Sequence, residues 1–180
     1  MRVIAGSAGG RKLISPTGVN IRPTADRMKE NLFNILAANI PDARFLDMFC
    51  GTGAIGIEAL SRGSQSAAFV DTDSTLLIRN LELTGFMEKA TILECDYAAA
   101  IYRLSEKHRE FDIVFMDPPY NKGLIPPAAK LISKTGLLSP QGLLAAELAP
   151  DEYLPPLEAL SLYKIKRYGT CVFCFFQKGI

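Results

Sequence analysis

The sequence of 180 residues has one histidine, no tryptophan and no apolar run long enough to cross a bilayer. It contains no internal repeat, no low-complexity segment and no composition shift that would mark a linker. No apolar segment follows Arg2 as a secretory signal would require, so we expect a cytoplasmic protein. A chain of this length is expected to form one domain around its own core.

The histidine and the cysteines do not predict a metal centre. His108 lies among charged residues near the end of an expected helix, and we interpret it as a surface residue rather than a catalytic base. Cys171 and Cys174 form a C-x-x-C within an expected strand, where residues three apart point to opposite faces. The pattern therefore predicts buried free thiols in a reducing compartment and no metal.

The net charge of +1 is unevenly distributed. Residues 1–30 carry six basic and two acidic side chains, whereas the rest of the chain is slightly acidic. A basic arm of this kind predicts contact with a polyanion such as RNA, although an ordinary solvated surface gives the same pattern. Arg22 and Arg27 lie near acidic residues, and we expect one of them to form an ion pair and the other to contact phosphate. The candidate RNA-binding residues are Arg2, Arg11, Lys12, Arg22, Arg27 and Lys29.

Strand-like and helix-like segments alternate along the rest of the chain. The expected strands are apolar on both faces, which is typical of a parallel sheet covered by helices on both sides. The last two strands flank Gly169 and must pair as an antiparallel hairpin. We predict an α/β fold with residues 1–23 as a basic N-terminal extension and 24–180 as a Rossmann-like core. The expected strands are 43–49, 66–71, 90–95, 111–116, 142–148, 162–168 and 170–177.

A glycine turn follows the first expected strand. Gly51, Gly53 and Gly56 satisfy G-x-G-x-x-G, and Asp71 ends the next strand, where a ribose-binding acid lies in NAD sites. Asp47 favours a different ligand, because a carboxylate beside the turn repels a pyrophosphate but attracts the ammonium of a methionine moiety. The structural alternative for Asp47 is that it caps a neighbouring turn.

The segment from Asp47 to Gly53 resembles the first motif of class I S-adenosylmethionine-dependent methyltransferases. In this interpretation Asp71 binds the ribose hydroxyls, with Asp73 as an alternative. Asp96, after the third strand, binds the adenine amino group or simply caps the next helix. The predicted cofactor-binding residues are Asp47, Phe49, Gly51, Thr52, Gly53, Asp71 and Asp96.

The fourth strand is followed by Asp117-Pro118-Pro119-Tyr120. Two prolines fix the backbone and remove two N–H donors, which leaves the Pro118 carbonyl free to accept a hydrogen bond. With the Asp117 carboxylate it offers two acceptors to one NH₂ group, and Tyr120 offers a ring on which a base can stack. This tetrad resembles the catalytic motif of methyltransferases that act on exocyclic amino groups, so all four residues are predicted to be catalytic.

The N-terminal sequence indicates one family among these methyltransferases. The runs Met1–Leu13 and Arg22–Leu36, with Phe49–Gly56, Asp117–Tyr120 and 167–169, are similar to the RsmD family of bacterial 16S rRNA (guanine-N2)-methyltransferases along essentially the whole chain. The resemblance implies a mostly parallel seven-stranded sheet that ends in an antiparallel hairpin. The family usually has glutamate where this chain has Asp71, which predicts a shorter reach to the ribose.

The resemblance implies a guanine N2 in small-subunit rRNA as the target, on a partly or fully assembled subunit, with S-adenosylmethionine as methyl donor. The motifs themselves do not choose guanine over adenine, so an adenine-N6 methyltransferase acting on RNA or DNA is an alternative. A non-catalytic ribosome assembly factor and an NAD-linked enzyme are two more. Nothing in the sequence requires a dimer, and we expect a monomer.

Overall fold

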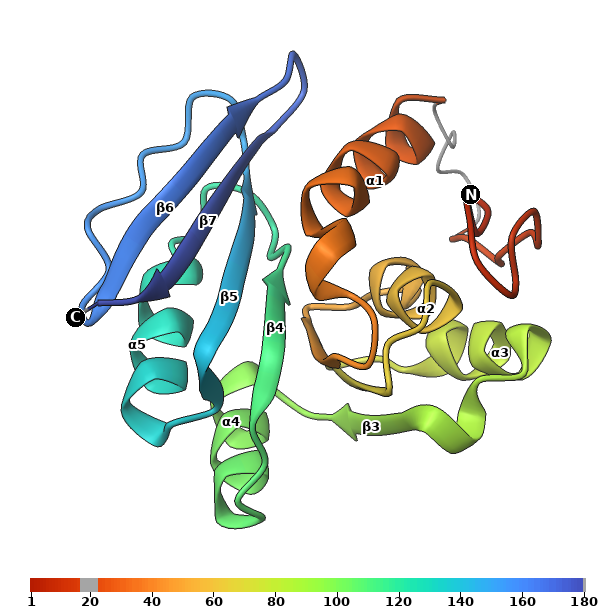
Figure 1. Cartoon of the computed structure of the whole chain (residues 1–180), viewed down its shortest axis with the longest axis horizontal. Coiled ribbons are helices and arrows are strands. Elements are labelled where there is room, and N and C mark those ends of the chain that lie inside the picture. The colour runs from red at the N-terminus through yellow and green to blue at the C-terminus, as the bar shows by residue number, and fades with distance from the viewer. Residues whose placement is uncertain (17–22, 180) are drawn as a thin grey trace.

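A single sheet organises the molecule (Figure 1). The computed structural model describes residues 1–16 and 23–179, and the strands within them follow the order β3-β2-β1-β4-β5-β7-β6. Neighbours from β3 to β5 are parallel, whereas β7 pairs antiparallel with both β5 and β6. The predicted fold class is confirmed. The strands are β1 (Arg44–Met48), β2 (Ser66–Asp71), β3 (Ala90–Glu94), β4 (Phe111–Met116), β5 (Leu138–Leu148), β6 (Leu160–Arg167) and β7 (Val172–Lys178).

Helices cover both faces of the sheet because its central strands are apolar on both sides. One buried cluster joins the sheet to α1 to α3, and a second joins the opposite face to α4 and α5. No helix in the described part of the chain is both long and apolar enough to cross a membrane. The helices are α1 (Pro23–Leu36), α2 (Ala54–Ser61), α3 (Thr75–Thr84), α4 (Tyr97–Glu106) and α5 (Ile125–Thr135), with short 3₁₀ turns at Ala37–Asn39 and Met87–Lys89.

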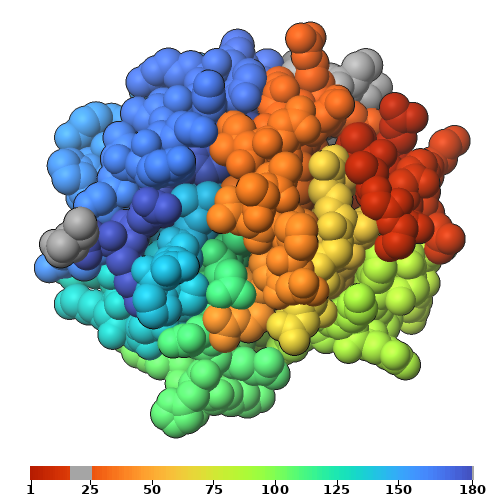
Figure 2. Space-filling model, in the orientation of Figure 1, coloured from red at the N-terminus to blue at the C-terminus, as the bar shows by residue number. Residues whose placement is uncertain are grey.

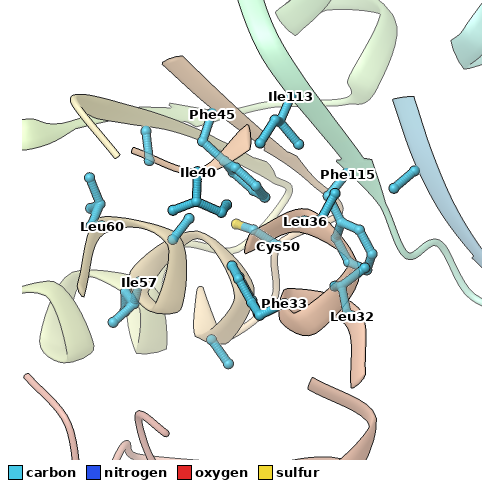
Figure 3. Close-up of a cluster of buried hydrophobic side chains, with 14 of the residues drawn as sticks. Leu32, Phe33, Leu36, Ile40, Phe45, Cys50, Ile57, Leu60, Ile113 and Phe115 are labelled. Atoms are coloured by element: carbon cyan, nitrogen blue, oxygen red, sulfur yellow. The ribbon is translucent and has the colours of Figure 1, made fainter. Parts of the chain in front are cut away.

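Helix α1 seals the first of these clusters. Figure 3 shows Leu32, Phe33 and Leu36 of α1 directed toward Phe45 of β1 and Phe115 of β4. These five side chains are fully buried, and burial of each contributes roughly 1.5–3 kcal/mol to folding. The helix is thereby fixed beside the carboxyl ends of the central strands.

The N-terminal segment is held against α2. Arg2 and Lys12 form an antiparallel bridge, and Val3 and Leu13 are buried. The side chain of Glu58 on α2 accepts hydrogen bonds from the backbone N–H groups of Ile4 (2.7 Å) and Ala5 (3.0 Å). Figure 2 shows the same arrangement from outside, with this segment (red) and the β6–β7 hairpin (blue) on opposite sides of α1 (orange).

Several strand boundaries differ from the sequence prediction. Strand β5 begins at Leu138 rather than Gly142, because the chain passes Pro140 with a register shift against β4 instead of a turn. The connection of the hairpin is longer than predicted, because β6 starts earlier, at Leu160, and β7 starts later, at Val172. Cys171 and Cys174 lie in the two different core clusters, as free thiols, which confirms that they point to opposite faces.

Candidate active site

Two cavities open at the carboxyl ends of β1 to β4. The first, of about 660 Å³, is lined by Asp71, Asp96, Tyr97 and the predicted catalytic tetrad. The second, of about 500 Å³, extends beneath α1 and is lined by Asp47, residues 49–52 and Glu147. Both cavities are lined by Phe49, Asp117 and Tyr120. Ligands in the two cavities would therefore meet at these three side chains.

The glycine turn brings the backbone to the edge of the second cavity. Gly51 has φ 52° and Gly53 has φ 76°, a conformation that glycine adopts without strain. Phe49 has φ 61°, which is strained in a residue with a side chain and places its ring beside Tyr97, with ring centroids 5.8 Å apart. A Cβ on Gly53 would overlap Leu77, so this glycine permits close packing of α3 and lines neither cavity.

Asp47 is the most buried acid of the second cavity. Its side-chain Oδ2 accepts a hydrogen bond of 2.8 Å from the Gly56 N–H, in the first turn of α2. Burial, with a smaller contribution from the negative charge of Asp71, raises the pKa of Asp47 from 3.8 to about 7, although the Gly56 hydrogen bond opposes this. One oxygen of the Asp47 carboxylate therefore acts as a cap, as the structural alternative proposed. The contact of Asp47 with a methionine ammonium stays a prediction.

The two acids of the first cavity also have protein partners. Asp71 Oδ2 accepts a hydrogen bond of 2.7 Å from the Gly51 N–H, and its Oδ1 accepts one of 2.8 Å from the Thr72 N–H. Asp96 caps α4 through Oδ1, which accepts from Ala98 and Ala99. A carboxylate has about four acceptor positions, so both residues can still bind a ligand. Their roles toward ribose and adenine stay predictions.

Asp73, the alternative to Asp71, lines neither cavity. It is exposed, and its Oδ1 accepts a hydrogen bond of 2.9 Å from the Thr75 N–H. This contact caps the N-terminus of α3, and hydrogen bonds from the Thr75 side chain and N–H lower the pKa of the Asp73 carboxyl. The geometry favours Asp71 as the acid that faces a cofactor.

The catalytic tetrad begins where β4 ends. The Asp117 N–H donates to the Met48 carbonyl of β1 (3.4 Å), which holds the start of the turn against the sheet. Pro118 is buried, whereas Pro119 and Tyr120 are exposed. Among the described residues, no backbone N–H donates to the Pro118 carbonyl, as the two-acceptor prediction requires.

The sequence prediction missed Glu147, which borders the tetrad. The Tyr120 hydroxyl donates to Glu147 Oε1 (2.6 Å), which fixes the tyrosine ring at the shared wall of the two cavities. Burial raises the pKa of Glu147, and burial together with Glu147 raises the pKa of Tyr120. The sequence did contain a signal for this residue, because Glu147 is the single ionisable residue in the otherwise apolar run Leu143–Leu148.

Asp117 shares this electrostatic environment. The residue is open to solvent across the cleft, but protein atoms surround the rest of its side chain. This partial desolvation and the nearby charges of Glu147 and Asp47 raise the pKa of Asp117. The same three acids make this part of the site favourable for positive charge.

The predicted RNA-binding residues separate into different environments. Lys29 is a correction: it is only 4% exposed, its Nζ lies 3.3 Å from Glu58 Oε2, and it also donates to the Arg2 carbonyl. Its desolvation lowers the pKa of its ammonium in spite of Glu58. Lys29 therefore anchors the N-terminal segment and is not available to a polyanion.

The other arm residues remain candidates. Arg2 pairs with Asp26 (3.4 Å), and Arg11 donates to the Leu83 carbonyl. Lys12 and Arg27 are exposed, and neither forms an ion pair with another described residue. Asp26, in the first turn of α1, therefore pairs with Arg2 rather than with Arg27. Arg22 lies outside the described residues.

The residues that line the cleft fit S-adenosylmethionine. The cleft combines a buried carboxylate for a cation at Asp47, a carboxylate for a diol at Asp71 and aromatic rings for a purine at Phe49 and Tyr97. With the strand order and the tetrad after β4, these features define an S-adenosylmethionine-dependent methyltransferase of the Rossmann-like class.

Comparison with known proteins identifies the family of the chain. The model of the family described as conserved hypothetical protein 95 matches residues 1–177, and the chain belongs to this family, the RsmD family. It is 37% identical over 182 residues to Ribosomal RNA small subunit methyltransferase D of Escherichia coli K12, covering 99% of this chain and 90% of that protein. It is 33% identical over 185 residues to Putative rRNA methyltransferase YlbH of Bacillus subtilis 168, covering 99% of both. The solved structure of a putative methyltransferase from Escherichia coli superposes with a TM-score of 0.84 at 32% identity, covering 99% of this chain and 97% of that one.

Proposed function

We propose that this protein transfers a methyl group from S-adenosylmethionine to the exocyclic N2 of a guanine in 16S rRNA of the small ribosomal subunit. The observation that carries the proposal is the position of Asp117 and Tyr120 at the meeting point of the two cavities, with Pro118 in the wall of the first. One cavity suits the adenosine part of the cofactor, and the other has room for its methionine part and for a base. The names of the relatives, which refer to small-subunit rRNA, support the substrate class.

The tetrad would act mainly by positioning. The Asp117 carboxylate and the Pro118 carbonyl accept the two N2 hydrogens, which directs the nitrogen lone pair away from the ring plane. Tyr120, held by Glu147, stacks against the base. S-adenosylmethionine supplies an electrophilic methyl group on a sulfonium. Positive charge develops on N2 as the methyl group arrives, and the two acceptors stabilise that charge more than the ground state.

The proton on N2 also needs an acceptor. The Asp117 carboxylate contacts that nitrogen in the proposed complex, and its raised pKa brings its basicity closer to neutral pH. Asp117 would therefore take the proton as the methylated amine returns to neutrality. This step uses only a residue already placed at the reacting atom.

Substrate binding would rely on cations outside the cavities. Lys12 and Arg27 are exposed and can contact phosphates. The backbone of the N-terminal segment is held in place by its hydrogen bonds with Glu58 and Lys29. We propose a monomer in the cytoplasm that meets 16S rRNA on the small subunit or on an assembly intermediate.

The test is transfer of a radiolabelled methyl group from S-adenosylmethionine to unmethylated 30S subunits and to naked 16S rRNA, followed by digestion to nucleosides. Label in N2-methylguanosine is expected, and the Asp117→Ala variant should transfer it about 10²–10³-fold more slowly. Label in N6-methyladenosine would keep the chemistry and overturn the proposed target. Binding of subunits without any transfer by the wild type would indicate an assembly factor instead.

A further inference from the structure

Glu147 lies beside Asp117 at the ends of neighbouring strands. Phe115 pairs with Ala145 and Met116 with Ala146 in the parallel β4–β5 register. Continued by one residue, the same register places Asp117 next to Glu147, on strands about 4.8 Å apart. Both side chains line the second cavity. Two carboxylates therefore face the space that the proposed function assigns to the target base.

Glu147 retains hydrogen-bonding capacity toward this cavity. One oxygen, Oε1, accepts from the Tyr120 hydroxyl, and the Cys171 thiol, a weak donor, lies beside the carboxylate. A carboxylate has about four acceptor positions, so these contacts do not satisfy it. A partly desolvated carboxylate with free acceptor positions favours a ligand that brings N–H donors.

The Watson–Crick edge of guanine brings such donors side by side. Its N1 carries a hydrogen next to the N2 amino group, whereas N1 of adenine is an acceptor next to the N6 amino group. An enzyme that modifies an unstacked base reads it by hydrogen bonds to this edge. The two neighbouring carboxylates match the N1–H and N2–H₂ pair of guanine and place an acceptor against N1 of adenine.

We propose that Glu147 accepts the N1–H of the target guanine while Asp117 and the Pro118 carbonyl hold its N2 amino group, so that Glu147 selects guanine over adenine. This inference rests on the proposed function and adds the residue that chooses the base. Adenine is rejected because its N1 lone pair would face the Glu147 carboxylate in a desolvated site, with neither acceptor satisfied.

A purely structural role for Glu147 makes a different prediction. If its only function were to hold the Tyr120 hydroxyl, its loss would impair every base that stacks on that ring to the same extent. Tyr120→Phe removes the same hydrogen bond but leaves the carboxylate in place. It is therefore the matched control for Glu147→Gln, which keeps the size of the side chain and replaces one acceptor with a donor.

The experiment compares guanine with 2-aminopurine at the methylated position, in subunits assembled on a 16S rRNA ligated from synthetic and transcribed fragments. 2-Aminopurine keeps the 2-amino group but has neither the hydrogen on N1 nor the oxygen at C6 of guanine, so the change of ratio in Glu147→Gln is what isolates N1. One lost hydrogen bond to a charged group should lower kcat/KM of the wild type on 2-aminopurine by about 10- to 100-fold. Glu147→Gln should lose activity on guanine but not on 2-aminopurine, because its amide can donate to N1, so the ratio should fall at least about tenfold. Tyr120→Phe should lower both activities and keep the wild-type ratio.

Equal use of the two bases by the wild type would overturn the role of Glu147, and this comparison needs no variant to fold. The same loss on both bases in Glu147→Gln would reduce Glu147 to a support for Tyr120. In either case, label in N2-methylguanosine from natural subunits would leave the proposed function intact. Label in another nucleoside would instead refute the proposed function, and with it this inference.

Discussion

The buried carboxylate of Asp47 should make cofactor binding depend on pH. Its pKa is raised to about 7 in the free protein, so a large fraction of molecules hold a proton there at neutral pH. The proposed methionine ammonium favours the ionised form, and the proton must leave before the ligand binds. The observed Kd is then the intrinsic value multiplied by about 11 at pH 6 and by about 1.3 at pH 7.5, an improvement of about eightfold.

Isothermal titration with S-adenosylhomocysteine, which carries the same ammonium, measures this directly. Repeating the titration in buffers of different ionisation enthalpy should reveal proton release near neutral pH. Asp47→Asn keeps an oxygen for the Gly56 N–H and should bind more weakly at pH 7.5 with no such slope. Asp73→Asn is the control, because this exposed acid has a lowered pKa and lines neither cavity. A flat wild-type profile, or the same slope in Asp47→Asn, would refute the reasoning.

The same raised pKa should affect folding in the opposite sense. The folded state binds the Asp47 proton more tightly than the unfolded chain does. The contribution of Asp47 to stability is therefore greatest below its ordinary pKa of 3.8 and is lost as pH rises through about 7. A shift of this size corresponds to about 4 kcal/mol at most. Urea unfolding between about pH 4 and pH 7 should therefore show a shallower decline in Asp47→Asn than in the wild type. Parallel declines would show that burial does not raise this pKa.

Three further substitutions separate chemistry, RNA contact and folding. Asp117→Ala should lower kcat by about 10²–10³ with little change in S-adenosylhomocysteine affinity, and an equal loss of both would contradict its role at the amino group. Lys12→Ala should weaken subunit binding and reduce the slope of log K against log salt by about 0.7–0.9, whereas an unchanged slope would remove Lys12 from the RNA contact. Glu58→Gln should cost about 3–5 kcal/mol of stability in urea unfolding, because it leaves the Lys29 ammonium buried without a charged partner. A loss below about 1 kcal/mol would mean that the pair is screened by solvent.

The fold could be predicted because its signals are local. Most strands contain a short apolar run, and the hairpin follows from two β-like runs around Gly169. The glycine turn and the tetrad were also found, since each is continuous in sequence and follows a strand. The boundary of β5 was wrong because Pro140, usually a sign of a turn, is accommodated at an irregularity in the ladder.

The environments of single charged residues could not be predicted in the same way. Lys29 belongs to a segment with more basic than acidic side chains, but its partner Glu58 belongs to the next helix, and only the packing of α1 on α2 brings them together. Glu147 was overlooked for the same reason, since its proximity to Asp117 depends on the register between β4 and β5. Pairing across elements is a tertiary property that composition and spacing do not encode.

Strand periodicity explains why the acids gather in one place. Asp47 and Phe45 share a face of β1, as do Asp117 and Phe115 on β4 and Glu147 and Ala145 on β5, and this is the face that α1 covers. Of the described residues that line the second cavity, the only one with a cationic side chain is Lys29, which is paired with Glu58. The cavity is therefore negative, and it should attract an ammonium, a sulfonium and the amino edge of a base while it repels phosphate. RNA phosphates are then restricted to the exposed arm, and an unpaired base is the part of the nucleic acid that can enter.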